Sequence, residues 1–164
     1  MRKAEVMQFA EHVAQELNYT PGSDLFPLVQ RLGGEIEYLG FDALEHTQDG
    51  SIDIRNHNDF TIYLSQFTGK SRDRFTIAHE LGHLFLHYWL QEHNGQHMQA
   101  ARVGTGRVEW EANWFAAGLL MPHDAVTEHF RKHSDISLLA DDFGVSFDAA
   151  RIRIETLKNQ DDIL

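Results

Sequence analysis

Apolar residues recur along the chain with two different periods. Between residues 4 and 17 they are three or four positions apart, as on the buried face of an amphipathic helix: Val6, Phe9, Ala10, Val13 and Leu17. A break at Pro21-Gly22 follows, and residues 25–32 predict a second, short helix that ends at Gly33-Gly34. Apolar and polar residues then alternate in the segments 35–39, 51–54 and 60–64, which predicts three strands. Because these strands follow one another closely, we expect a small, largely antiparallel sheet.

The second half of the chain has a mainly helical pattern. One apolar stripe runs from Arg72 to about Trp89, and the polar, glycine-containing stretch 91–106 predicts a loop. Further helices are expected at 107–120 and from about 122 to 133, followed by two short ones within 136–158, around Gly144. The pattern indicates an α+β fold with a helical C-terminal part. We expect residues 1–133 to form one domain and residues 134–164 a helical extension packed on it.

Composition narrows the classes of function. The chain has 14 Lys and Arg against 25 Asp and Glu, a net charge of −11, so its field repels nucleic acid and anionic membrane surfaces. It has no cysteine, which excludes disulfides, thiolate zinc sites and cysteine nucleophiles. Glu5, Glu11 and Glu16 interrupt the N-terminal segment where a signal peptide would be apolar, and no apolar run is long enough to span a bilayer. We expect a cytoplasmic protein that binds neither nucleic acid nor membrane directly.

The segment His79-Glu80-Leu81-Gly82-His83 has the spacing of a zinc site. Four residues are about one helical turn, so His79 and His83 leave the same face of the predicted helix and can bind one ion. Glu80 lies beside a ligand, where its carboxylate can accept a proton from a water molecule at the metal. A chance match is the alternative, and about 0.05 such matches are expected in a chain of this composition. Gly82 lowers helix stability, which indicates close packing beside the site.

A catalytic zinc usually has three protein ligands, and the third is not obvious. An extended motif would need glycine at position 86 and histidine at position 89, where the chain has Leu86 and Trp89. The better source is the next predicted helix, which begins with Glu109 and Glu111. Glu109 is explained equally well by the preference of carboxylates for helix N-termini. Glu111 lies on an apolar face, where a carboxylate needs a partner, and we favour it as the third ligand.

Two longer segments resemble a known family. RFTIAHELGHLFLH at 74–87 and EWEANWFAAGLLMP at 109–122 are similar to the ImmA/IrrE family of metallopeptidases, with a weaker match at 143–153. The resemblance implies a Zn²⁺ ion held by His79, His83 and Glu111, with Glu80 as the catalytic acid and base. It also implies a small zincin-like core with a helical C-terminal part. The expected substrate is an XRE-type helix-turn-helix repressor encoded nearby, whose cleavage relieves transcriptional repression.

Other residues near the motif have weaker interpretations. His87 continues the series 79, 83, 87, and helix packing is favoured over a contact with the substrate. Candidates for stabilising a tetrahedral intermediate are Tyr88, His93, His97 and Arg102. Arg72 and Arg74 are expected to be solvated or paired with carboxylates, and Trp89, Trp110 and Trp114 to pack in the core or the cleft wall. The strand 60–64 is equally compatible with an edge that pairs with an extended peptide and with an ordinary sheet strand.

Residues 138–151 have the pattern of a helix-turn-helix, with glycine at the turn. Asp141, Asp142 and Asp148 are unfavourable beside phosphates, so a structural or repressor-docking role is favoured over DNA binding. Two functions therefore follow. The leading one is a zinc endopeptidase of narrow specificity. The alternative is a non-proteolytic zinc-binding regulator that binds a repressor, an antitoxin-like partner or DNA, and the intact Glu80 favours the enzyme.

Overall fold

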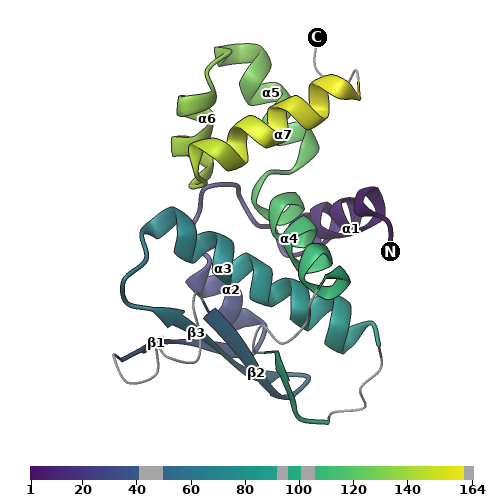
Figure 1. Cartoon of the computed structure of the whole chain (residues 1–164), viewed down its shortest axis with the longest axis vertical. Helices are drawn as coiled ribbons and strands as arrows, with labels where there is room; N and C mark the ends of the chain where they lie inside the picture. Colours follow the sequence, from purple (N-terminus) through teal and green to yellow (C-terminus); the bar gives the residue numbers. More distant parts are fainter. Residues whose placement is uncertain (41–49, 92–95, 101–105, 161–164) are drawn as a thin grey trace.

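A four-stranded sheet forms one end of the molecule, and helices are stacked above one of its faces (Figure 1). The structure, a computed structural model, describes residues 1–40, 50–91, 96–100 and 106–160. Its helices are α1 (Lys3–Glu16), α2 (Phe26–Arg31), α3 (Lys70–Gly82), the π-helix η2 (His83–Trp89), α4 (Arg107–Leu120), α5 (His123–His133), α6 (Ile136–Phe143) and α7 (Phe147–Asn159). Its strands are β1 (Gly34–Leu39), β2 (Gly50–Asn56), β3 (Asp59–Ser65) and β4 (Met98–Ala100). None of the helices in these ranges has the length and apolar character needed to cross a membrane.

The strand order in the sheet is β1-β3-β2-β4. β2 is antiparallel to both β3 and β4, whereas β1 is parallel to β3. The expected α+β class and the three longer strands are confirmed. β3 has a neighbour on each side, so it is not the edge strand that an extended peptide could join. β4 lies within the stretch predicted to be a loop, because three residues are too few to give a recognisable alternation.

The core lies between the sheet and α3, and continues between α3, α4 and α1. Ile62 and Leu64 of β3 are fully buried, as are Ile77 and Leu81 of α3 to within 1 %. α4 packs across α3 and against α1 (Figure 1). Close contact of α3 with α4 requires Gly82, because a Cβ atom there would lie 3.1 Å from the Cα atom of Ala112. The expectation of tight packing at Gly82 is confirmed.

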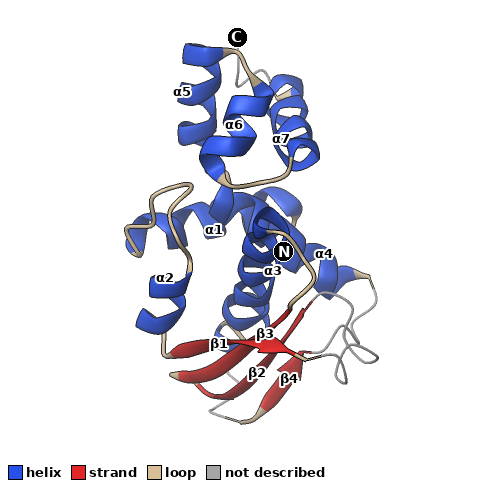
Figure 2. Ribbon diagram, turned by 90° about the vertical axis from the view of Figure 1, so that its left-hand side faces the viewer, coloured by secondary structure: helices blue, strands red, loops and turns tan. Residues whose placement is uncertain are grey.

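The helices α5, α6 and α7 lie at the end of the molecule opposite the sheet (Figures 1 and 2). α6 and α7 are joined by a turn in which Gly144 has a φ of 65°, a conformation that favours glycine. Arg74 of α3 donates hydrogen bonds to the carbonyl oxygen atoms of Gly144, at 3.1 Å, and Ser23, at 2.6 Å. Arg74 therefore connects the helix of the motif to this turn and does not pair with a carboxylate in these contacts. The division at residue 133 stays a prediction.

Candidate metal centre

The two motif histidines lie where α3 passes into the π-helix η2. His79 is in the last turn of α3, and His83 is the first residue of η2. Their Nε2 atoms are 3.2 Å apart, as the four-residue spacing predicts. His83 is only 2 % exposed. π-Helical turns are rare and occur frequently at functional sites, which is consistent with the position of this one.

The carboxylate that faces these histidines belongs to Glu109, in the first turn of α4. Its two oxygen atoms lie 3.1 Å from Nε2 of His79 and 3.3 Å from Nε2 of His83. The ligating atoms of all three residues lie within 4.8 Å of one another. Two imidazoles and one carboxylate are a donor set typical of catalytic zinc, so the three residues fit the ion that the motif implies.

In this geometry Glu109 faces the two histidines, whereas the expected third ligand, Glu111, contacts His87. Which of the two glutamates binds the metal stays a prediction. The Glu111 carboxylate accepts hydrogen bonds from His87 Nε2 at 3.1 Å, the Met1 ammonium at 3.0 Å and Arg107 Nε at 3.1 Å. Both glutamates lie in the first part of α4, but residues two apart on a helix point in different directions. The crossing of α4 over α3 turns Glu109 toward His79 and His83. It turns Glu111 toward His87, which follows His83 by one helical turn.

The ring nitrogen atoms that face away from the cluster have partners. Nδ1 of His79 is 2.8 Å from Oδ1 of Asn113, and Nδ1 of His83 is 3.0 Å from Nδ1 of His87. Hydrogen bonds of this kind fix the tautomer and orientation of a metal-binding imidazole. Glu109 and Asn113 are one turn apart on α4, and this spacing is the sequence signal that could have identified Glu109. His87 is buried, and its contact is with the site rather than with the apolar core alone.

The pKa values of His83 and Glu111 favour binding of a cation at the cluster. Burial, with the neighbouring His79 and His87, lowers the pKa of His83 to about 3, so its imidazole is neutral at physiological pH, the form that binds metal. Burial alone would raise the pKa of Glu111. Hydrogen bonds from the Met1 ammonium, His87 and Arg107 outweigh that effect and lower the pKa of its carboxyl to about 2. Glu111 is therefore ionised and supplies negative charge behind His87.

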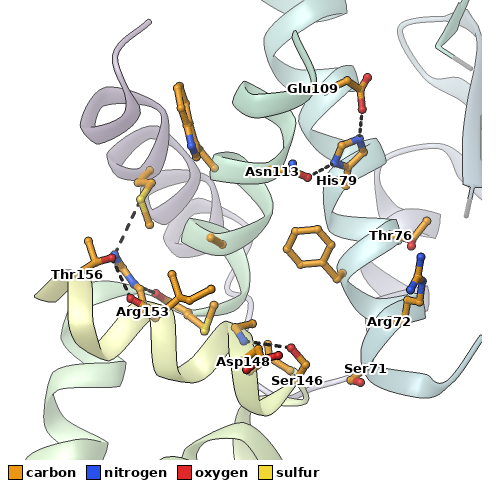
Figure 3. Close-up of a pocket in the computed structure, with 18 of the residues that line it drawn as sticks. Ser71, Arg72, Thr76, His79, Glu109, Asn113, Ser146, Asp148, Arg153 and Thr156 are labelled. Carbon is orange, nitrogen blue, oxygen red and sulfur yellow. Dashed lines mark hydrogen bonds and ion pairs between the residues drawn. The ribbon is translucent and has the colours of Figure 1, made fainter. Parts of the chain in front are cut away.

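Glu80 lies beside the cluster on the same cavity. It is 2 % exposed, and it lines a cavity of about 880 Å³ together with His79, Glu109 and Asn113. Figure 3 shows the labelled His79, Asn113 and Glu109 at one end of this cavity, with α7 residues such as Asp148 at the other. Glu80 and two of the three candidate ligands, His79 and Glu109, therefore face a common space large enough for more than a metal and a water molecule.

The remaining candidates are distributed around the site. Arg72 and Trp114 line the cavity, whereas Trp110 is 57 % exposed and packs in neither the core nor the cleft wall. Tyr88 is fully buried, and His97 pairs with Asp53 of β2. His93 and Arg102 lie outside the described residues.

An α+β fold with an HExxH helix, and a carboxylate from the following helix facing the two histidines, defines a domain of the metallopeptidase class. The sequence model of the peptidase M78 family, described as the IrrE N-terminal-like domain, matches residues 40–155, and the chain belongs to this family. The expected resemblance to the ImmA/IrrE family is thereby confirmed.

Among solved structures, the fold is similar to that of a Mycobacterium tuberculosis transcriptional regulator. The TM-score is 0.67 and the sequence identity 22 %, and the match covers 94 % of this chain but 47 % of that protein. At this identity the likeness concerns the fold alone, and this chain spans about half the length of the regulator. No curated protein matches the chain.

Proposed function

We propose that this protein is a zinc-dependent endopeptidase of narrow specificity. The observation that carries the proposal is the convergence of His79, His83 and Glu109 within 4.8 Å. Two of these residues, His79 and Glu109, line the same cavity as Glu80. The three residues would hold the ion. A zinc ion in such a site lowers the pKa of a water ligand to about 7 and polarises a carbonyl group.

The residues of the chain would divide the remaining work. Glu80 accepts the proton of the attacking water and returns it to the amine that leaves as the peptide bond breaks. Asn113 and His87 hold the two imidazoles in the orientation that directs Nε2 to the ion. The buried position of Glu80 limits bulk water around its carboxylate, which strengthens its interaction with the reacting groups.

The substrate we propose is an XRE-type helix-turn-helix repressor encoded nearby, cleaved to relieve repression. Membership of the IrrE-like family supports a regulatory target, and the structural neighbour is itself a transcriptional regulator, which is consistent with one. The net charge of −11 favours a basic partner such as a DNA-binding protein. The alternative is a zinc-binding regulator that binds its partner without cleaving it.

Replacement of the proposed base separates these two functions. Glu80→Gln keeps the size of the side chain but cannot accept a proton, so the variant is expected to fold and bind one zinc while cleavage falls by about 10²–10⁴-fold. Wild type and variant are co-expressed with the neighbouring repressor, the repressor is followed by gel, and zinc is measured by elemental analysis.

Equal cleavage by the two proteins would exclude Glu80 as the base. Binding of the repressor without cleavage by the zinc-loaded wild type, under conditions that induce the repressed genes, would favour the non-proteolytic regulator. An Arg151→Gln variant is a suitable control, because this exposed side chain forms its ion pairs with Asp148 and Glu155 of the same helix, α7.

A further inference from the structure

The cavity beside the metal cluster extends well beyond the residues that the chemistry needs. From His79 and Glu109 it continues between α3 and α4 and reaches α7 (Figure 3). Ser146 and Asp148 at the start of α7, and Arg153 and Thr156 further along it, line the far end. One continuous space therefore connects the candidate metal site to the C-terminal helices.

The middle and far parts of this space have a mainly apolar wall. Six of the lining residues come from three different regions of the chain: Phe75 of α3, Trp114 and Ala117 of α4, and Val145, just before α7, with Ala149 and Ile152 within it. Phe75 is one turn before His79, and their rings are 6.5 Å apart, so the apolar wall begins directly beside the metal cluster. The buried Arg153 does not interrupt it as a free charge, because its guanidinium is bound to Glu11 at 2.8 Å and to the Met121 carbonyl at 3.0 Å.

The position of Ile152 is informative. Its side chain is 52 % exposed, on a helix whose other face packs into the protein through Ala150, Ile154 and Leu157. A large apolar side chain that is open to a cavity leading to a candidate metal site is typical of a surface that binds an apolar group. α7 is also the second helix of the unit that resembles a helix-turn-helix. Asp148 and Ile152 of that helix line the cavity, so this face borders the space that leads to the metal site rather than being free to enter a DNA groove.

We propose that α7 forms the specificity wall of the active-site cleft, and that Ile152 and Trp114 bind a large aliphatic or aromatic side chain of the substrate. This inference rests on the proposed peptidase function and adds the chemistry of its substrate. An extended tripeptide is about 10 Å long. Because the ring of Phe75 is 6.5 Å from that of His79, a short segment at the metal site also reaches the apolar wall. Burial of an apolar side chain there supplies the binding free energy that selects the segment.

The test uses the zinc-loaded full chain and two probes, the hydroxamates of trileucine and triglycine. The hydroxamate group binds zinc in both probes, and only one of them carries apolar side chains. Binding is measured by calorimetry. Trileucine hydroxamate is expected to bind at least about tenfold more tightly, because hydrophobic pockets discriminate by about 10-fold or more for each methylene group well accommodated.

Substitutions at two positions of α7, Ile152 and Phe147, test whether the apolar wall causes the preference for trileucine. Ile152→Asp is expected to remove most of the preference for trileucine while the affinity for triglycine hydroxamate stays unchanged, and Ile152→Ala to reduce the preference in part. Phe147→Asp is the matched control: Phe147 is 51 % exposed, begins the same helix and does not line the cavity, so the preference should persist.

Three outcomes would overturn the inference. The apolar wall would be contradicted if the wild type bound both probes with equal affinity, or if Phe147→Asp and Ile152→Asp reduced the preference for trileucine equally. Neither result would contradict the peptidase proposal. Failure of both hydroxamates to bind the zinc-loaded chain would instead contradict an accessible zinc site, and the proposed function would fail with it.

Discussion

Glu109 and Glu111 show how two identical side chains on one helix can have different roles. Glu109 faces His79 and His83 at 3.1 and 3.3 Å. Glu111 is one step removed from the cluster, since its contact at 3.1 Å is with His87, which in turn lies 3.0 Å from His83. The chain His83–His87–Glu111 resembles the carboxylate–histidine pairs that orient metal ligands in other proteins.

Substitution of each glutamate should distinguish a ligand from an orienting group. Glu109→Ala removes the carboxylate proposed as the third metal ligand, and we expect it to abolish stoichiometric zinc binding. Glu111→Gln should still bind one zinc, with an affinity lower by about 10–100-fold, because the lost charge weakens the orientation of His87 and His83. Zinc affinity is measured by competition with a chelating dye, and circular dichroism checks the fold.

If Glu111→Gln lost zinc and Glu109→Ala kept it, Glu111 would be the third ligand. Glu5→Gln serves as the control, since Glu5 pairs with Arg2 on the exposed start of α1 and should leave zinc affinity unchanged.

At the scale of the elements, the site depends on how closely three helices approach. Gly82 allows α3 to contact α4, and Gly118 allows α4 to contact α1, where an added Cβ atom would lie 2.7 Å from the carbonyl oxygen of Met7. Backbone atoms cannot move aside as the end of a flexible side chain can. Both glycines cost helix stability locally, and the close packing of α4 offsets that cost.

Gly118→Ala is expected to lower the free energy of unfolding by about 1–2 kcal/mol. Alanine favours the helix by about 1 kcal/mol, but overpacking against the backbone of α1 costs about 1–3 kcal/mol, and the larger value applies when backbone must move. Urea unfolding measures the difference.

Gly69→Ala provides the comparison, since a Cβ atom at Gly69 would meet nothing within 4 Å. A Gly118→Ala protein that is more stable than the wild type would show that α1 and α4 are not in the close contact described.

At the scale of the full fold, the buried Arg153 connects the C-terminal helices to the rest of the protein. Arg153 of α7 is 5 % exposed and binds Glu11 of α1 and the carbonyl group at the end of α4. Glu11 also accepts a hydrogen bond from the backbone N–H of His123, at the start of α5. One ion pair therefore links α1, α4, α5 and α7, and keeps α7 at the cavity.

Arg153→Met should reduce the free energy of unfolding by about 3–5 kcal/mol, because it leaves the Glu11 carboxylate partly buried without its cation. The same change should weaken binding of trileucine hydroxamate more than that of triglycine hydroxamate, as α7 loses its position. Urea unfolding and calorimetry give the two quantities. Arg151→Met, whose partners Asp148 and Glu155 are exposed, should leave both unchanged. Equal effects of the two substitutions would count against Arg153 as the connection.

Features that depend on local geometry could be predicted from the order of residues alone. The spacing of His79 and His83 places both on one face of a helix whatever surrounds it, and the periods of apolar residues are sufficient to locate the longer helices and three of the strands. Glu80 is next to His79 in the sequence, so its location close to the metal site could be predicted as well.

The groups that meet across elements could be known only once the chain was folded. Glu109 and Glu111 both begin an apolar helix, and the choice between them depends on the angle and closeness of the α3–α4 crossing, which no short stretch of sequence contains. The central place of β3 depends on a parallel pairing with β1 across intervening residues. The direction of α7 toward the cavity depends on Arg74 and Arg153, whose partners Ser23, Met121 and Glu11 are 32 to 142 residues away in the chain. Such contacts are set by packing of the whole core, because each helix can bury its apolar face in more than one orientation until its neighbours are in place.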